Sequence, residues 1–377
     1  MRIPGGVSGN LGRAQSLAPQ RCPECTALHI RERTAEPGAE RGDAVTGEGA
    51  PRLRPRGARA ERKIGPGLHG LLRHVQDHVV HRNVDTLATM RVVSLVPAAT
   101  EMVWALGATD QLVAVTHDDD FPPAVLALPR LTRSTIPAGA SAREIDAHVR
   151  EAGARGESTF HLDEQALRDA RPDVILGQTL CAVCAVTLDR IPASLKHRPE
   201  VVPLTASTID GMFDDIRRVG AALRSEVAAD RLIDGLRSRL ATIEEQVEEL
   251  PRPRVACLEW LDPLFNGGHW VPEQVRIAGG EDVLGVAGAR SREIAWNDVI
   301  AARPEIVIAM PCGWDAARAA HEAQAIGPIG SARIVGVDGA AYFSRPGPRL
   351  VDGVELLASI FHPDAVTAPS GAMALRV

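Results

Sequence analysis

Cysteine and histidine side chains on loops offer the first chemistry in this sequence. Cys181 and Cys184 form a C-x-x-C pair after one predicted strand, and Cys312 follows another. With His117 and His269 on neighbouring predicted loops, these sulfur and nitrogen atoms could hold zinc or another transition metal. The pair could equally be redox active, and cysteine is also common as a small buried residue. The spacing matches no standard zinc site, so these alternatives stay open.

Aromatic residues gather in the same predicted loops, which is informative because only 3 % of the chain is aromatic. Ligands of parallel α/β sheets bind outside the carboxyl ends of the strands, and apolar rings with a few polar groups suit a large, flat ligand. The predicted ligand-binding residues follow the predicted strands: Pro97, Ala98, Thr100, Glu101, His117, Asp118, Phe121, Gln178, Cys181, Cys184, Trp260, Asp262, Phe265, His269, Trp270, Pro311, Cys312, Gly313, Trp314, Tyr342, Phe343 and Arg345. The alternative is that the aromatic side chains only fill an interface between two lobes.

Enzyme signatures are missing from the sequence. It holds no P-loop, no G-x-S-x-G, no H-E-x-x-H and no G-x-G-x-x-G after a strand. No nucleophile, base and orienting group can be matched by their spacing. We therefore predict a protein that is not an enzyme.

The elements that must position these loops are repeated strand–loop–helix units. They predict an α/β fold with two Rossmann-like lobes, residues 90–224 and 251–364, each built on a central parallel sheet, and a tail at 365–377. The segment ARPDVIL at 170–176 has an echo in ARPEIVI at 302–308. Both segments lie between a predicted helix and a cysteine-bearing loop, which favours duplicated lobes.

One long helix is predicted to join the lobes over residues 225–250. Its apolar residues recur three and four apart, Ser225 can cap its start, and Pro251 forbids continuation. At about 1.5 Å per residue it would be roughly 39 Å long. Gly235 is the weak point of this helix, and we expect it to provide close-packing space against a lobe.

Bulk composition limits the class of protein. The 377 residues allow two or three domains, and a net charge of -6 argues against a nucleic-acid partner. No apolar run reaches the ~20 residues that cross a bilayer, and residues 1–19 show no signal-peptide core. These features predict a cytoplasmic monomer with no membrane insertion, or an exported protein if the true start differs. Residues 1–89, rich in Gly, Pro and Arg, are predicted to be a disordered or non-native extension with an incidental Cys22–Cys25 pair.

Several motifs between residues 90 and 364 resemble the vitamin B12 and iron-siderophore class of periplasmic-binding-protein-like domains. More narrowly, they are similar to its signal-less cobalamin-binding branch. The motifs are VSLVPAATE at 93–101, LCAVCAV at 180–186, EWLDP at 259–263, GHWVPE at 268–273, MPCG at 310–313 and YFSRPGPRL at 342–350.

The resemblance implies two lobes bridged by one rigid helix and a cobalamin (corrinoid) ligand in the cleft, with ABC transporter components as partners. An iron-siderophore or haem ligand is the alternative within the class. The branch carries a cysteine in the loop where this chain reads THDDDFP at 116–122, so any scheme that needs that thiol does not transfer.

Overall fold

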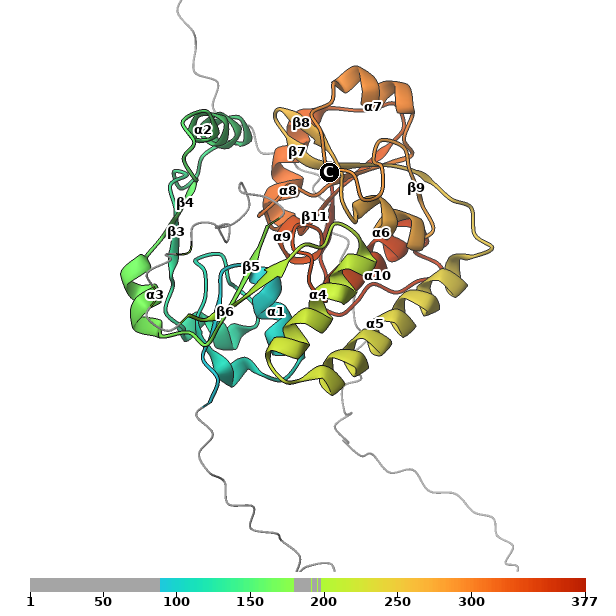
Figure 1. Ribbon diagram of the computed structural model, residues 1–377. Helices are drawn as coiled ribbons and strands as arrows, with labels where there is room; N and C mark the ends of the chain where they lie inside the picture. Colours follow the sequence, from blue (N-terminus) through green and yellow to red (C-terminus); the bar gives the residue numbers. More distant parts are fainter. Residues whose placement is uncertain (1–88, 180–190, 192–194, 196–197) are drawn as a thin grey trace, which may run out of the picture. The chain divides into compact units, whose positions relative to one another are not determined.

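Four parallel strands in the order β2-β1-β5-β6 form the sheet of the first lobe. The structure, a computed structural model, describes residues 89–179, 191, 195 and 198–377 (Figure 1). The strands of this sheet and the helical elements joined to them are β1 (Val92–Ser94), α1 (Pro97–Ala105), η1 (Thr109–Gln111), β2 (Leu112–Ala114), η2 (Pro123–Ala127), β5 (Val174–Gln178), β6 (Glu200–Leu204) and α4 (Ile209–Ala222). Buried aliphatic side chains on every strand explain why helices cover it.

A second, two-stranded antiparallel sheet carries a helix away from this lobe. It consists of β3 (Thr132–Ser134), α2 (Ala142–Ala154) and β4 (Phe160–Leu162), and α3 (Glu164–Ala170) follows. We call residues 132–162 the arm. Ser141 and Glu144 form a capping box at the start of α2, with the Ser141 side chain accepting from the Glu144 backbone N–H. Sequence analysis assigned no element between residues 123 and 161.

The second lobe contains a mixed sheet rather than the purely parallel one predicted. Its order is β12-β11-β10-β7-β8, with β9 also paired to β7, and both β8 and β12 run antiparallel to their neighbours. Its elements are β7 (Arg254–Leu261), β8 (Leu264–Asn266), α6 (Val271–Ile277), β9 (Glu281–Asp282), α7 (Trp296–Ala302), β10 (Ile306–Ala309), α8 (Ala316–Ala323), η4 (Gln324–Ile326), β11 (Arg333–Val337), α9 (Gly339–Tyr342), α10 (Leu350–Phe361) and β12 (Ala374–Arg376).

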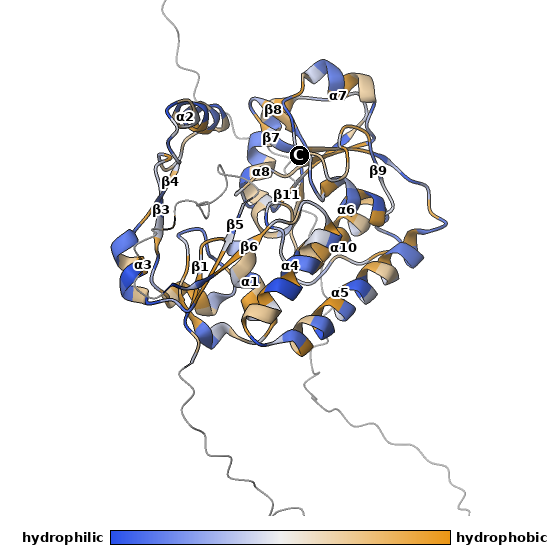
Figure 2. Cartoon of the chain, viewed as in Figure 1, coloured by the Kyte–Doolittle hydropathy of each residue, from blue (hydrophilic) through white to orange (hydrophobic). Residues whose placement is uncertain are grey.

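The predicted joining helix is α5 (Glu226–Val247), so the predicted fold class is confirmed. Its buried stripe runs through Ile233, Leu236 and Leu240, and it packs on α4 of the first lobe and on α6 and α10 of the second. Figure 2 shows apolar and polar bands alternating along α5. Arg239 fixes it to α10, with Nε 2.7 Å from Glu355 Oε1 and Nη2 2.5 Å from Asp352 Oδ1.

The sequence echo corresponds to a repeated structural joint. Both α3 and α7 end on an arginine in the left-handed region, Arg171 at φ 45° and Arg303 at φ 47°, and a proline then leads into β5 or β10. In the first lobe Arg91 Nε donates to Ala170 O at 2.8 Å. In the second, Arg254 Nη2 donates to Ala302 O at 2.8 Å. An arginine at the start of β1 or β7 therefore binds a carbonyl at the end of the returning helix in each lobe.

Two further expectations differ from the structure. Residues 374–376 of the predicted tail form β12, since their backbone pairs with the edge strand β11. Gly235 is exposed, and a Cβ added there meets nothing within 4 Å, so the expected packing role is wrong.

No helix among the described residues is long and apolar enough to cross a membrane. The predicted extension at residues 1–89, apart from its last residue, lies outside the described residues, and so does its Cys22–Cys25 pair.

Candidate functional site

Charged side chains join the two lobes at the carboxyl ends of their sheets. Arg349 in the second lobe reaches Glu101 on α1, with Nε 3.0 Å from Oε2 and Nη2 2.6 Å from Oε1. Arg345 Nη1 lies 2.5 Å from Asp120 Oδ1 and 3.5 Å from Glu101 Oε1, and its Nη2 lies 3.0 Å from Asp118 O. We call Glu101, Asp120, Arg345 and Arg349 the clasp.

In the clasp, burial and the neighbouring arginines shift the pKa values of the carboxyl groups in opposite directions. Burial raises the pKa of Glu101, and the hydrogen bond and positive charge of Arg349 reduce that rise without cancelling it. Burial also acts on Asp120, but Arg345 outweighs it and holds the pKa of this carboxyl below its ordinary value. The clasp is thus a largely desolvated ion network across the cleft, and both of its guanidinium groups already face carboxylates.

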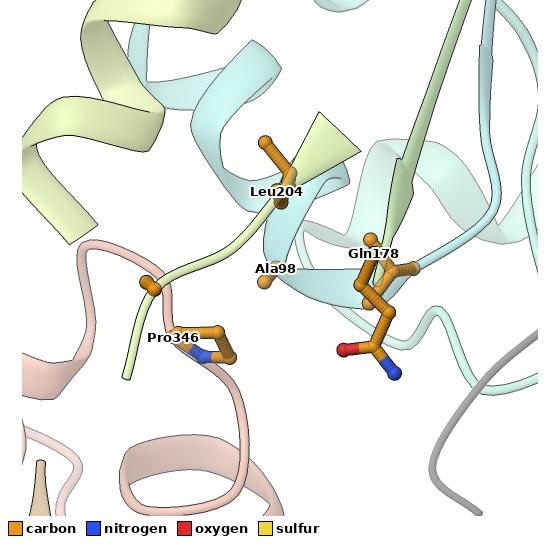
Figure 3. A pocket seen from close by; sticks show the side chains of 6 residues that line it. Ala98, Gln178, Leu204 and Pro346 are labelled. Carbon is orange, nitrogen blue, oxygen red and sulfur yellow. The ribbon is translucent and has the colours of Figure 1, made fainter. Parts of the chain in front are cut away.

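A small apolar pocket lies beside the clasp, between the end of the first sheet and the loop after α9. Its cavity volume is only about 10 Å³, and it is lined by Val96, Ala98, Gln178, Leu204, Ala206 and Pro346. Figure 3 shows Ala98 and Leu204 facing Pro346 across it, with the Gln178 side chain to one side. Pockets for drug-sized ligands are typically about 300–1,000 Å³, so this pocket is far smaller than a complete ligand cavity.

An aromatic stack extends the clasp on the first lobe. The Arg349 guanidinium lies 4.3 Å from the ring centre of Phe121, and Phe121 packs edge-on against Trp104 with centroids 4.8 Å apart. Tyr342 lies farther off, 6.0 Å from Arg349. Phe121 and Tyr342 are only partly buried, so both rings are placed to contact a ligand at this edge.

Trp260 near the end of β7, Trp314 after β10 and Arg318 on α8 form a separate group, which we call the platform. The two indole centroids are 5.1 Å apart, and the Arg318 guanidinium lies 3.9 Å from the Trp314 ring. The platform is in contact with the arm. Trp260 Nε1 donates to Ala142 O at 3.2 Å, and Arg318 Nη2 donates to Ala140 O at 2.8 Å. Trp314, which packs against Trp260 and Arg318, is only 4 % exposed.

Several residues predicted to bind ligand are core residues instead. Trp270 is 4 % exposed, and its Nε1 donates to Phe343 O at 2.7 Å, while Phe343 itself is 2 % exposed. Pro97, Thr100 and Pro311 are also buried. Phe265 pairs with Trp260 in the β7–β8 ladder, and Asp262 is bound by Arg143 of the arm, with Nη2 2.8 Å from Oδ1. The aromatic side chains therefore fill the lobe interior as well as the cleft.

The predicted metal ligands are not brought together among the described residues, where no group of three or more His, Cys, Asp or Glu could hold an ion. His117 Nδ1 lies 2.7 Å from Thr132 Oγ1, and its ring packs on Phe160 at the base of the arm. His269 lies beside Trp270, and burial lowers the pKa of its imidazole. Cys312 and Gly313 are exposed on the turn after β10. Cys181 and Cys184 lie outside the described residues.

Sequence reasoning missed Arg349, Asp120 and the arm residue Arg143. Arg349 stands four residues after the predicted Arg345 and at the start of α10, a spacing that could have paired the two arginines. Glu273 was missed as well. It accepts from the Ile209 backbone N–H at 2.7 Å and so binds α6 of the second lobe to the start of α4.

Comparison with known proteins places this geometry among binding proteins. A family model described as periplasmic binding protein matches residues 92–325. The vitamin B12-binding protein of Vibrio cholerae is 21 % identical over 277 residues, which is 70 % of this chain and 86 % of that protein. The Bacillus subtilis ABC transporter substrate-binding lipoprotein YvrC is 21 % identical over 289 residues, or 73 % and 80 %.

Solved structures of two binding proteins share the fold. A periplasmic heme-binding protein from Pseudomonas aeruginosa has a TM-score of 0.56 at 19 % identity, covering 76 % of this chain and 98 % of that one. The periplasmic vitamin B12-binding protein of Vibrio cholerae has a TM-score of 0.50 at 20 % identity, covering 72 % and 96 %.

These matches correct the predicted cytoplasmic location. The family and the similar proteins are periplasmic or belong to a transporter lipoprotein. The prediction was drawn from the lack of an apolar run in residues 1–19, and such an absence has no weight against matches that span most of the described residues.

Proposed function

The chain belongs to the periplasmic binding protein family, and on that premise we propose that it binds one corrinoid in the cleft between its lobes without catalysing a reaction. The similar vitamin B12-binding protein supports this choice of ligand. The ligand would rest on the apolar pocket of Figure 3 and meet Phe121, Tyr342 and the clasp at its edge.

The charge state of the clasp is the observation that favours a corrinoid over haem. A corrinoid ring carries neutral amide side chains, whereas haem carries two carboxylates. Both clasp arginines already face the carboxylates of Glu101 and Asp120, and the neighbouring Asp118 adds a further negative charge. A dianionic ligand would have to displace these carboxylates and would leave Glu101, whose side chain is 2 % exposed, as an unpaired buried charge, which disfavours binding.

We also propose that ABC transporter components are the protein partners, since one similar protein carries that function in its name. A metal- or redox-active protein using the cysteines is the other candidate from the sequence. Two of those cysteines lie outside the described residues, so the experiment below includes it.

Isothermal titration with cyanocobalamin, haemin and a ferric siderophore tests the ligand. We expect cyanocobalamin to bind with a stoichiometry near one and more tightly than haemin. Asp120→Asn removes one clasp carboxylate, so it should shift the preference towards haemin, while Arg155→Met, which breaks only the exposed Arg155–Glu157 pair, should bind like the wild type. Tight haemin binding without cyanocobalamin binding contradicts the proposal. No binding of any ligand, with stoichiometric zinc in the purified protein, favours the metal site.

A further inference from the structure

The arm crosses from the first lobe to the second at a place far from α5 in the sequence. It leaves the first lobe after Leu131 and returns at Asp163, whose backbone N–H donates to Leu131 O at 2.8 Å. Between these points α2 lies against the second lobe, with Arg143 bound to Asp262 and Arg150 Nη2 2.8 Å from Glu293 Oε2 (Figure 1). The arm therefore adds a second connection between the lobes, which is made by side-chain contacts and not by the covalent chain.

The contacts that hold α2 on the second lobe are individually weak. The Arg143 and Asp262 side chains are 78 % and 45 % exposed, and those of Arg150 and Glu293 are 53 % and 54 % exposed. Exposed ion pairs of this kind contribute little to stability. Between described residues, the platform also donates two hydrogen bonds to the arm, to the carbonyls of Ala140 and Ala142. Contacts this weak allow α2 to leave the second lobe and to return to it.

The arm is also built so that α2 can move as one piece. Thr132 and Leu162 pair across its two strands, and α2 has its own capping box at Ser141. Gly139 and Gly156 stand on either side of α2 with φ 77° and 70°, a conformation that glycine adopts without strain. The base is fixed by the Thr132–His117 contact, so release at α2 need not unfold the strands.

The surface beneath α2 is apolar and aromatic. Ala142 is 5 % exposed and belongs to the hydrophobic cluster of the second lobe together with Trp314. With α2 docked, Trp260 donates to the Ala142 carbonyl, and Trp314 packs against Trp260 and Arg318. Release of α2 would uncover Trp260 and Trp314. The arm thus occupies a surface that a flat apolar ligand could contact.

We propose that the arm is a latch: α2 docks on the platform to hold the lobes together, and its release uncovers the platform and opens that side of the cleft to the ligand. The identity of the ligand rests on the proposed function, but the existence of the latch does not.

Hydroxyl-radical footprinting of the apo protein, read residue by residue by mass spectrometry, tests release. Trp314 and Trp270 are both 4 % exposed, but Trp314 packs on Trp260, whose Nε1 donates to the Ala142 carbonyl of α2, whereas Trp270 Nε1 donates to Phe343 O, so Trp270 is an internal control. We expect Arg143→Met/Arg150→Met to raise Trp314 oxidation about two- to fivefold per lost pair and to leave Trp270 unchanged. Arg155→Met, inside the arm but away from the second lobe, should leave both unchanged. Equal Trp314 oxidation in the folded double variant and the wild type would overturn the latch.

Stopped-flow association of cyanocobalamin then tests the opening of the cleft. The double variant should associate several-fold faster than the wild type and Arg155→Met. Raised Trp314 oxidation with an unchanged association rate would overturn the role in ligand entry. If cyanocobalamin binds no variant, the proposed function fails, and the footprint alone decides whether the arm is a latch.

Discussion

Removing one partner of the Glu101–Arg349 pair in the clasp should lower the free energy of unfolding more than removing both partners. Glu101→Gln keeps the shape of the side chain but removes the charge that faces two arginines. Arg349 alone makes two charge-assisted hydrogen bonds to Glu101, at 3.0 and 2.6 Å. Such bonds contribute about 1.5–3 kcal/mol each, and removing one partner of a buried ion pair costs about 3–5 kcal/mol. We therefore expect a loss of about 3 kcal/mol in the free energy of unfolding.

A double-mutant cycle with Arg349→Met separates this pair from its surroundings. Arg349→Met also loses the contact with the Phe121 ring, but that loss appears in the single and the double variant and cancels. We expect a coupling energy of about 2 kcal/mol, measured by urea unfolding followed by far-UV circular dichroism. Arg155→Met is the matched control and should unfold like the wild type. Additive single effects would refute the reasoning, because they would show that Glu101 and Arg349 do not stabilise each other.

Three further predictions follow from the fold. Gly235→Ala should raise the free energy of unfolding by about 1 kcal/mol, because the new Cβ meets open space on an exposed helix face; an unchanged or lower urea midpoint contradicts this. Stability should fall as pH rises above the ordinary carboxyl pKa values of 3.8 and 4.5, because a group with a raised folded pKa binds its proton more tightly in the native state than in the unfolded one. The melting temperature should therefore decline as the pH rises from these values, and a rise would show that the groups with lowered pKa values, Asp120, Glu144 and His269, dominate. The carboxyls with raised pKa values are Glu101, Asp119, Asp215, Asp282, Asp338 and Asp352. A chain that begins at Met90 should melt at the temperature of the full chain, and a clearly lower melting temperature would place the domain boundary earlier.

Local signals explain how much of the fold could be predicted. The apolar stripe of residues 225–250 predicts one helix, which the structure contains as α5. The two ARP segments each predict a following strand, and these strands are β5 and β10. The arm was missed although Ser141 and Glu144 show the S-x-x-E pattern of a capping box, because the short strands around α2 have little alternation. Gly235 was misjudged because a sequence does not show which side of a helix faces a neighbour.

The candidate site was harder to predict, since its contacts join residues far apart in the chain. Arg349 and Glu101 are 248 positions apart, and nothing in their local sequence indicates that they meet. The list of residues after the strands included Glu101 and Arg345, which the structure brings together, with Arg345 Nη1 3.5 Å from Glu101 Oε1. It also included Trp270 and Phe343, because loop position alone does not distinguish an aromatic side chain that points into the core from one that points into the cleft.

The buried stripe of α5 has a consequence for how the protein unfolds. One continuous hydrophobic cluster contains Val92 of the first sheet, Leu240 of α5 and Val255 of the second sheet. Neither lobe can therefore lose its packing without exposing part of the surface that supports the other. A single cooperative transition is the expected behaviour, and a fragment cut at either end of α5 should collect as a loosely packed, aggregation-prone intermediate rather than as an independent folding unit.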